Sequence, residues 1–401
     1  MSNSIIAERL SSIKPSPILS INSKAKMLAA QGKPILDLSA GEPDFPTPQN
    51  ICQAAKDAMD QGETHYTICD GTVELKQAII DKFKRENGLD YQINQISVSV
   101  GAKKILYNLF LSTVNPGDEV IMPAPYWASY PDMVALAGGK GIICHTNERF
   151  ILEPHTLEQV ITPKTKWLLI NSPGNPSGAV YTKQDLAKLA EVLLQHPHVH
   201  IISDDIYEHI IYGKKQFCTM AAVEPRLYER TFTVNGVSKA YAMTGWRIGY
   251  VGGGKPEVIK AMAKIQSQTI GCPSSISQAA AVEALNGPQD FISDRNVAFQ
   301  KRRDYLTGEI NSIDGLGSGT PDGAFYLLIS CQDLVGKKTP GGKIIANDRD
   351  FCEYLLEDCH VATVPGIVFG CENFFRISYA TQDEVLKKSC EAIREACQKL
   401  K

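Results

Sequence analysis

The sequence has 401 residues, of which 41 are basic and 44 acidic, so its formal charge is −3. Hydrophobic residues make up 43% and charged residues 21%, a balance typical of globular proteins that argues against disordered, collagen-like and coiled-coil chains. No apolar run approaches the ~18 residues of a membrane span, and no block of like charge occurs. We therefore expect neither a membrane nor a nucleic acid as partner.

The N-terminal residues and the cysteines indicate the compartment. The sequence Met-Ser-Asn-Ser-Ile-Ile-Ala-Glu-Arg-Leu has no basic region, apolar core and cleavage site of a signal peptide. Eleven cysteines are scattered from Cys52 to Cys397 without a C-x-x-C pair, which is typical of reduced thiols and not of a disulfide framework or a zinc site. We expect a cytoplasmic protein without a metal.

From about residue 95 to 255, short β-rich runs alternate with amphipathic helical segments. The expected strands are 96–100, 118–122, 166–171, 200–204 and 231–235. The expected helices are 103–114 and 182–194, and Thr182-Lys-Gln-Asp185 resembles a capping box at the start of the second. Near-continuous apolar strands separated by helices predict an α/β fold with a mostly parallel sheet covered on both faces.

The last hundred residues have a different pattern. Strands are expected at 324–329, 361–364 and 374–379, around a helical stretch at 350–358, and a C-terminal helix begins near Gln382. This pattern predicts a second, smaller α+β unit.

Polar residues follow the ends of several predicted strands, where open parallel sheets bind their ligands. They are the Gly101-Ala102-Lys103 turn, Asn175, Asp204 with Tyr207, and Ser238 with Lys239 and then Arg247. The turn opens a helix whose free N–H groups favour a phosphate. A lysine amine, a carboxylate, amide and phenol donors and an anion site together suit pyridoxal phosphate, which needs each of them.

Several motifs in this order resemble those of class I aminotransferases of fold type I. Ser238-Lys-Ala-Tyr-Ala-Met-Thr-Gly-Trp-Arg-Ile-Gly-Tyr250 is similar to the lysine signature of that family. Further matches are Ala40-Gly-Glu-Pro-Asp-Phe45, Pro125-Tyr-Trp-Ala-Ser-Tyr130, Asn175-Pro-Ser-Gly178, Ser203-Asp-Asp-Ile-Tyr-Glu208 and Phe375-Arg-Ile-Ser-Tyr379. The sequence is most similar to the bacterial aspartate aminotransferase branch, which includes prephenate and aromatic aminotransferases.

The resemblance implies a role for each residue around the cofactor ring. Lys239 would be the Schiff-base lysine and the base that moves the proton between substrate and cofactor. Asp204 would pair with the pyridinium nitrogen, Asn175 and Tyr207 would contact the ring oxygen, and Trp127 would stack on the ring. Asp205 is interpreted as a residue that only ends the strand.

The resemblance also implies phosphate and substrate contacts. The phosphate would be held by Ser238, Arg247 and the amides of Ala102 and Lys103, and by Tyr66 of a neighbouring subunit, which implies a homodimer with shared sites. Arg376 would bind the substrate α-carboxylate as a bidentate fork, which Lys cannot reproduce. Gly41 would bring its backbone N–H to the same carboxylate, and Trp127 and Asn175 would also face the substrate.

The preferred substrate is less strongly indicated. Lys103 matches the position that binds the distal carboxylate in this branch, with Ser16 as a possible helper, but Ile18 stands where relatives carry Thr. Asp70 could repel a dicarboxylate or hold Lys103. We expect aspartate:2-oxoglutarate transamination, with an aromatic or prephenate aminotransferase as the alternative. A β-lyase on the same fold is a further alternative, and a cofactor-sensing regulatory domain would need a DNA-binding module that is not evident.

The motifs also predict two interleaved domains. A large cofactor domain would span 46–290, and a small domain would combine 1–45 with 291–401. The alternating His196, His198 and His200 are interpreted as a surface loop entering a strand and not as metal ligands, because no Cys or acidic cluster accompanies them.

Overall fold

A seven-stranded sheet forms the centre of the protein in a computed structural model that describes residues 5–11, 13 and 17–401. The strand order is β2 (Ile96–Ser99), β8 (Gly249–Gly253), β7 (Thr231–Gly236), β6 (His200–Asp204), β5 (Thr165–Asn171), β3 (Glu119–Ala124) and β4 (Lys140–His145). All neighbours from β7 to β4 pair in parallel, and β8 is antiparallel to both β7 and β2. The predicted mostly parallel α/β fold is confirmed.

Strand β8 determines where the loops meet. Because it is antiparallel to both of its neighbours, β2 runs in the same direction as β7. The carboxyl ends of β2, β3, β5, β6 and β7 therefore lie along one edge of the sheet. That edge is where an open parallel sheet places its ligand site.

The glycines of β8 explain why the sequence pattern did not predict this strand. Gly252 packs against Tyr91 and Gly253 against Phe232, and a Cβ at either glycine would come within 2.4 Å of a ring carbon. Glycine is depleted in strands because it lacks a side chain to pack, so a glycine-rich run carries little strand signal. Here the neighbouring aromatic rings fill the space.

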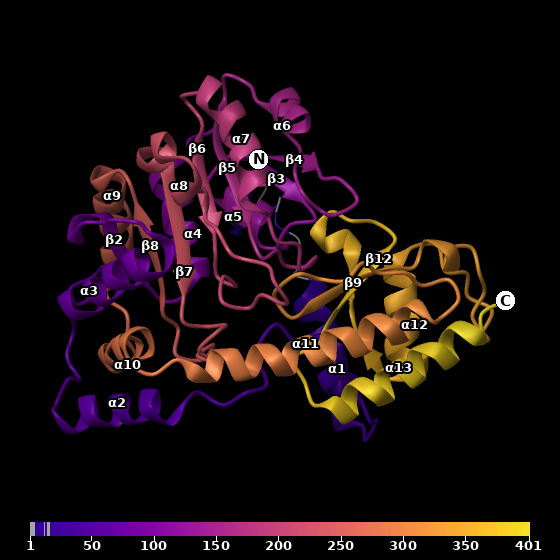
Figure 1. Ribbon diagram of the computed structural model, residues 1–401. Helices are drawn as coiled ribbons and strands as arrows, with labels where there is room; N and C mark the ends of the chain where they lie inside the picture. The colour runs from indigo at the N-terminus through magenta and orange to yellow at the C-terminus, as the bar shows by residue number, and fades with distance from the viewer. Residues whose placement is uncertain (1–4, 12, 14–16) are drawn as a thin grey trace.

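Helices cover both faces of the large sheet (Figure 1). Alternate residues of β5 point to opposite faces: Trp167 and Leu169 belong to a core with α4 (Ala102–Thr113), α5 (Tyr130–Leu136) and α9 (Pro256–Thr269). Leu168 and Ile170 pack with α6 (Pro154–Val160), α7 (Lys183–Gln195) and α8 (Met220–Val223). The predicted capping box is present, since Thr182 and Asp185 each accept a hydrogen bond from the other's backbone N–H.

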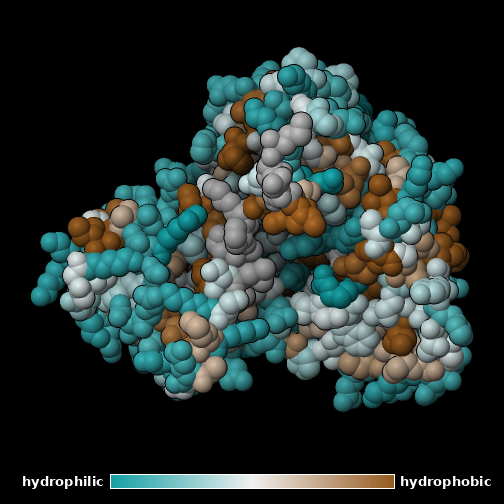
Figure 2. Space-filling view, turned by 180° about the vertical axis from the view of Figure 1, so that it is seen from behind, coloured by the Kyte–Doolittle hydropathy of each residue, from teal (hydrophilic) through white to brown (hydrophobic). Residues whose placement is uncertain are grey.

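A third core joins the β2 end of the sheet to helices that the sequence analysis did not delimit. These are α2 (Gln49–Asp60), α3 (Val73–Lys82), which continues as a π-helical turn at Phe83–Asn87, and α10 (Ser275–Asn286). Seen from behind, the surface is mostly hydrophilic, with hydrophobic side chains in several separate patches (Figure 2). Among the described residues, no helix is long and apolar enough to cross a membrane.

The C-terminal unit contains an antiparallel sheet of order β11 (Val364–Pro365), β12 (Phe374–Ser378) and β9 (Tyr326–Ser330), with α12 (Asp348–Cys359) and α13 (Asp383–Gln398). The strand expected at 361–364 is divided, because β10 (Val361–Ala362) leaves this sheet and pairs with β1 (Leu36–Asp37). Residues near the N-terminus thus pair with the C-terminal unit, which also carries α1 (Pro17–Ala30). The domain boundaries themselves stay a prediction.

The 22-residue helix α11 (Asp290–Asn311) connects the two parts. It runs from beside α10 to the region of α12 and α13 (Figure 1). Its Phe299 and Leu306 belong to the core of the C-terminal unit, whereas Phe291 near its start packs on the core of α2 and α10. One helix therefore contacts both cores.

Candidate active site

Lys239 lies in the loop after β7, at the carboxyl edge of the large sheet. Its Nζ donates a hydrogen bond of 2.6 Å to the carbonyl oxygen of Gly41 and lies 5.8 Å from the centroid of the Tyr207 ring. Burial lowers its pKa to about 8; Glu42 opposes this shift, and the positive charges of Arg376 and Arg247 add to it. At neutral pH a larger share of this amine is therefore uncharged than for an ordinary lysine, as a nucleophile or base requires.

Asp204 ends β6 and is 3% exposed. Its Oδ2 accepts a hydrogen bond of 2.6 Å from the Tyr130 hydroxyl, and its buried Oδ1 has no hydrogen-bond partner. Burial raises the pKa of Asp204 to about 6, against the opposing hydrogen bonds of Tyr130 and the Ile206 N–H and the charge of Lys239. A buried carboxylate oxygen without a donor fits a protonated ring nitrogen as its missing partner.

Asp205, the next residue, is also buried, but its surroundings are different. The Ser203 hydroxyl donates a hydrogen bond of 2.7 Å to it, and burial raises its pKa to about 8. A carboxyl group that remains protonated at neutral pH does not balance the charge of a cation. Each of the two aspartates has one buried oxygen without a hydrogen-bond partner, so the higher pKa of Asp205, and not the geometry, is what distinguishes them.

Arg376 projects from β12 and bonds to the loop after β5 and to the segment after β1. It is 2% exposed, and it donates hydrogen bonds of 2.9 Å to Asn175 Oδ1 and 2.8 Å to the Ser39 carbonyl. Its guanidinium carbon lies 4.4 Å from the centroid of the Tyr326 ring. Within the described part of the chain no carboxylate forms an ion pair with Arg376, and its Nε has no hydrogen-bond partner. A buried arginine without an acid is suited to a carboxylate ligand.

Tyr326 contacts both Tyr207 and this arginine. The two phenol oxygens are 2.9 Å apart, and both side chains are buried. A Cβ at Gly41 would lie 3.2 Å from the Tyr326 hydroxyl, so glycine allows the backbone to approach closely at this point. Tyr326 thus connects three predicted site residues, although no role was predicted for it.

The predicted phosphate residues gather at the start of α4. Gly101, with φ of +94°, is the N-cap of this helix, and a Cβ there would lie 2.5 Å from a guanidinium nitrogen of Arg247. A Cβ at Gly249 would lie 2.1 Å from the amide nitrogen of Ala102. The small residues thus leave the first amides of the helix and the arginine side by side, an arrangement suited to a phosphate. Ser238 lies in the loop that carries Lys239 and is 7% exposed.

Of the two alternatives for Asp70, the structure contradicts one. Its carboxylate pairs with Lys76 Nζ at 2.7 Å and so does not hold Lys103, because α3 brings Lys76 next to it. Lys103 Nζ instead lies 4.7 Å from the centroid of the Trp127 ring. Burial, assisted by the charge of Arg247, lowers the pKa of Lys103.

Two further predictions concern Tyr66 and Ser16. Tyr66 is 98% exposed in the single chain, as expected if its partner belongs to another subunit. Ser16 lies outside the described residues, and for Ile18 only its place in α1 is described.

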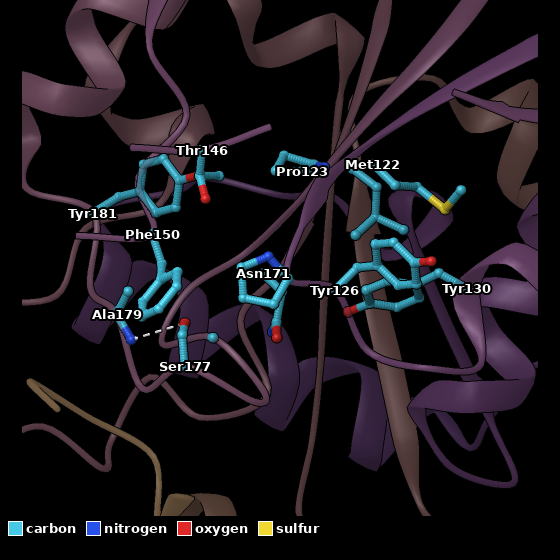
Figure 3. Close-up of a pocket in the computed structure, with 13 residues that line it drawn as sticks. Met122, Pro123, Tyr126, Tyr130, Thr146, Phe150, Asn171, Ser177, Ala179 and Tyr181 are labelled. Atoms are coloured by element: carbon cyan, nitrogen blue, oxygen red, sulfur yellow. Dashed lines mark hydrogen bonds between the residues drawn. The ribbon is translucent and has the colours of Figure 1, made fainter. Parts of the chain in front are cut away.

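A small cavity of about 20 Å³, lined by both polar and apolar side chains, adjoins Tyr130 at the ends of β3 and β5. In Figure 3 the rings of Tyr126 and Tyr130 lie close together on one side of Asn171, with Phe150 and Tyr181 on the other side. This volume suits about one water molecule. The cavity therefore has no room for a substrate but can hydrate the polar groups around it.

A buried ionic network includes Glu208, the residue that follows Tyr207 in the sequence. Lys82, which is fully buried, forms an ion pair with Glu208, and Asn87 and Asn235 donate hydrogen bonds to the same carboxylate. Nearby, Glu86 Oε2 lies 2.8 Å from His209 Nε2. Glu86, Glu208 and His209 have the residue types of a metal site, but the Lys82 ammonium is already in contact with both carboxylates. The network anchors the 204–209 segment to the end of α3.

The comparisons with known proteins agree with this geometry. Residues 33–393 match the family described as "Aminotransferase class I and II". The aspartate aminotransferase of Rhizobium meliloti (strain 1021) is 56% identical over 98% of this chain and 96% of that protein. The aspartate/prephenate aminotransferase of Cereibacter sphaeroides is 51% identical over 98% of each chain.

Solved structures show the same relationship. The crystal structure of the Rhizobium meliloti aspartate aminotransferase has a TM-score of 0.96 at 55% identity, covering 99% of each chain. The aspartate aminotransferase from Thermus thermophilus with maleate has a TM-score of 0.91 at 40% identity, covering 98% of this chain and 99% of that one. With a family match over most of its length and relatives this similar, the chain belongs to the class I and II aminotransferases.

Proposed function

We propose that this enzyme transfers the amino group of L-aspartate to 2-oxoglutarate by a ping-pong mechanism with pyridoxal 5′-phosphate. One observation carries the proposal: a weakly basic Lys239, a buried Asp204 with a free oxygen and a buried Arg376 without an acid occur at the same sheet edge. The phosphate arrangement at α4 and the unpartnered Asp204 Oδ1 fit the two ends of this cofactor.

When bound, the cofactor would supply an aldehyde that condenses with amines, with loss of water, and an electron-accepting ring. Lys239 Nζ would provide the amine for this bond, and as a free amine it would take up and return the α-proton of the substrate. Asp204 would hold the proton of the ring nitrogen, Asn175 and Tyr207 would donate hydrogen bonds to the ring oxygen, and Trp127 would contact the ring. Ser238, Arg247 and the amides of Ala102 and Lys103 would hold the phosphate.

Arg376 and Gly41 orient the substrate. The guanidinium binds the α-carboxylate in two parallel hydrogen bonds, and the backbone N–H of Gly41 adds a third. Because Arg376 already donates to Asn175, binding of substrate at this arginine is coupled to a residue beside the cofactor. Orientation of the α-hydrogen toward Lys239 is the expected result.

Lys103 is the proposed cation for the distal carboxylate of aspartate. Its position over Trp127 places a positive charge beside the expected ring-stacking residue, and pairing of Asp70 with Lys76 removes a competing acid. Relatives are named aspartate aminotransferase, and one solved relative was obtained with maleate, a dicarboxylate. Others are named aspartate/prephenate aminotransferase, which keeps an aromatic or prephenate substrate as the alternative.

Steady-state kcat/KM for aspartate and for phenylalanine, with 2-oxoglutarate as acceptor, tests the proposal. We expect the value for aspartate to be higher, and a preference for phenylalanine above tenfold would overturn the first choice. Incubation with aspartate alone also separates a β-lyase, since transamination converts the bound cofactor to its amine form without release of ammonia. A β-lyase would instead release ammonia and pyruvate from a cystathionine-like substrate, which carries the leaving group on Cβ that aspartate lacks.

Tyr130→Phe is expected to weaken cofactor binding at mildly acidic pH. The Tyr130 hydrogen bond opposes the effect of burial and lowers the pKa of Asp204, so removing it raises that pKa. In the variant, Asp204 is therefore already protonated at a pH at which the parent carboxylate is still charged. The midpoint of the pH dependence of the cofactor dissociation constant should rise by about one unit, or about 1.4 kcal/mol. Tyr181→Phe is the control, because that phenol lines the same cavity but contacts the Leu152 N–H. An equal shift in both variants would refute the role of Tyr130.

The remaining proposals concern assembly and location. A homodimer with shared sites would give the exposed Tyr66 a partner, the cofactor phosphate of the other subunit. The pairing of β1 with β10 supports a small domain of 1–45 and 291–401 beside a large domain of 46–290. A cytoplasmic location follows from the thiol-rich composition and stays a prediction.

A further inference from the structure

The loop of residues 41–47 carries Gly41 and is bonded to the loop that carries Lys239. Lys239 Nζ donates to the Gly41 carbonyl, and the Thr244 hydroxyl donates a hydrogen bond of 2.8 Å to Glu42. Further along, the hydroxyl of Thr47 donates a 2.7 Å hydrogen bond to the carbonyl of Ala242 in the lysine loop. The position of the 41–47 loop and that of the lysine are therefore linked.

Helix α11 holds the other side of the same loop. Arg302 NH1 donates a hydrogen bond of 2.9 Å to Asp44 Oδ1, and Arg295 NH2 donates one of 2.7 Å to the Pro46 carbonyl. The ring of Phe45 lies between these arginines, with centroid distances of 5.1 Å to Arg295 and 5.5 Å to Arg302, and contacts Phe299 edge-on at 5.3 Å. The loop is thus fixed between α11 and the lysine loop.

Arg302 also reaches a second acid. Its Nε donates a hydrogen bond of 2.9 Å to Asp383 Oδ1, in the first turn of α13. The Arg302 side chain is only 11% exposed, which limits screening of both pairs by solvent. One planar guanidinium therefore joins the 41–47 loop to the C-terminal unit that carries Arg376.

We propose that Arg302 is a positioning residue that sets the place of Gly41 relative to Arg376 by holding Asp44 and Asp383 together. The inference rests on the proposed function, in which Gly41 and Arg376 bind the same substrate carboxylate. Gly41 comes from the N-terminal segment and Arg376 from β12, so their spacing depends on contacts between distant parts of the chain. A small misplacement of such a group can lower kcat/KM by up to about a hundredfold, and here the loss is expected in KM, because Gly41 and Arg376 are proposed to bind the substrate.

Arginine is needed here because the two carboxylates approach different edges of one guanidinium. Asp44 is bound at NH1 and Asp383 at Nε, and the rigid plane fixes their relative positions. A lysine ammonium at this position would keep the charge but not the geometry. Both aspartates are partly exposed, so the contribution of the pairs to overall stability is modest. The expected effect therefore concerns the site more than the fold.

Arg302→Met tests the proposal in the full-length enzyme saturated with pyridoxal phosphate. KM for the amino acid should rise about tenfold with kcat changed less than threefold, while the dissociation constant of the cofactor stays within twofold of the parent. Arg302→Lys should recover only part of the loss. Arg303→Met is the matched control: this neighbouring arginine is equally buried, but it contacts Asp304 and the Pro321 carbonyl instead of the loop.

A double-mutant cycle separates positioning from general destabilisation. If Arg302 acts through Asp44, the effects of Arg302→Met and Asp44→Asn on KM should be strongly non-additive. Additive effects, or an equal rise of KM in Arg303→Met, would overturn the proposal. Hydrogen exchange of residues 41–47 in the cofactor-free protein gives a readout that does not depend on transamination. Faster exchange in Arg302→Met is expected there even if the substrate proposal fails, and unchanged exchange would also overturn the inference.

Discussion

Replacing Lys239 by alanine is expected to reduce transamination on the order of ten-thousandfold. The amine would be both the group that forms the covalent link and the base that transfers the α-proton, and no other described lysine donates to Gly41 in its place. The low pKa of about 8 shows that its surroundings favour the free amine. Initial rates with aspartate and 2-oxoglutarate, at saturating cofactor, measure the loss.

Measuring cofactor binding in the same variant separates a loss of catalysis from a loss of the cofactor. Asp204 and the α4 phosphate site are unchanged in Lys239→Ala, so the variant should still bind pyridoxal phosphate, but borohydride reduction should no longer fix it to the protein. Lys255→Ala is a suitable control, since Lys255 precedes α9 at the opposite edge of the sheet. If Lys239→Ala retains more than a tenth of the activity, or if reduction still labels the protein, the assignment is incorrect.

Regular elements could be predicted where local pattern and packing agree. The buried strands β5, β6 and β7 and the capped helix α7 begin and end within about one residue of the expectation, because apolar runs and a Thr182–Asp185 box are local signals. Strand β8 could not be predicted in this way, since its glycines are required by the rings of Tyr91 and Phe232, which are distant in the sequence. The division of 361–364 between two sheets likewise depends on pairing with β1.

Among the site residues, sequence reasoning identified those within motifs and missed those that act through long-range contacts. Asp204 and Lys239 follow strand ends and could be predicted from that placement. Tyr130 stands inside the Pro125–Tyr130 motif, yet only Trp127 received a role there, because the bond of Tyr130 to Asp204 spans 74 positions. Tyr326 contacts Tyr207 across 119 positions, and no local signal marks it.

Asp70 illustrates the opposite error. Its proximity in sequence to Tyr66 suggested a place at the mouth of the site. The ion-pair partner of a carboxylate, however, depends on which residues the fold brings next to it. The helical position of Lys76, six residues later, provides the closer cation. A charged residue near a motif is therefore a weak indicator of substrate preference until its partner is known.

Arg376→Met is expected to lower kcat/KM for every amino-acid substrate on the order of a thousandfold, about 4 kcal/mol. The loss should be similar for aspartate and phenylalanine, because both carry the α-carboxylate that Arg376 is proposed to bind. Arg376→Lys should recover part of the loss, because lysine keeps the positive charge but cannot form both of the parallel hydrogen bonds. Kinetics of the first half-reaction with each amino acid provide the comparison.

Stability separates this binding role from a structural one. In the ligand-free enzyme Arg376 is buried without a carboxylate partner, and burial lowers its pKa. The charged guanidinium therefore reduces the free energy of unfolding of the ligand-free enzyme. Its removal should change the free energy of unfolding little, because lost hydrogen bonds to Asn175 and Ser39 are offset by relief of the uncompensated charge. A structural arginine would behave differently, and its replacement would cost several kcal/mol. A variant that loses activity and unfolds at much lower denaturant concentration would thus contradict the proposed role, whereas lost activity with near-parental stability would identify Arg376 as a residue kept for its ligand.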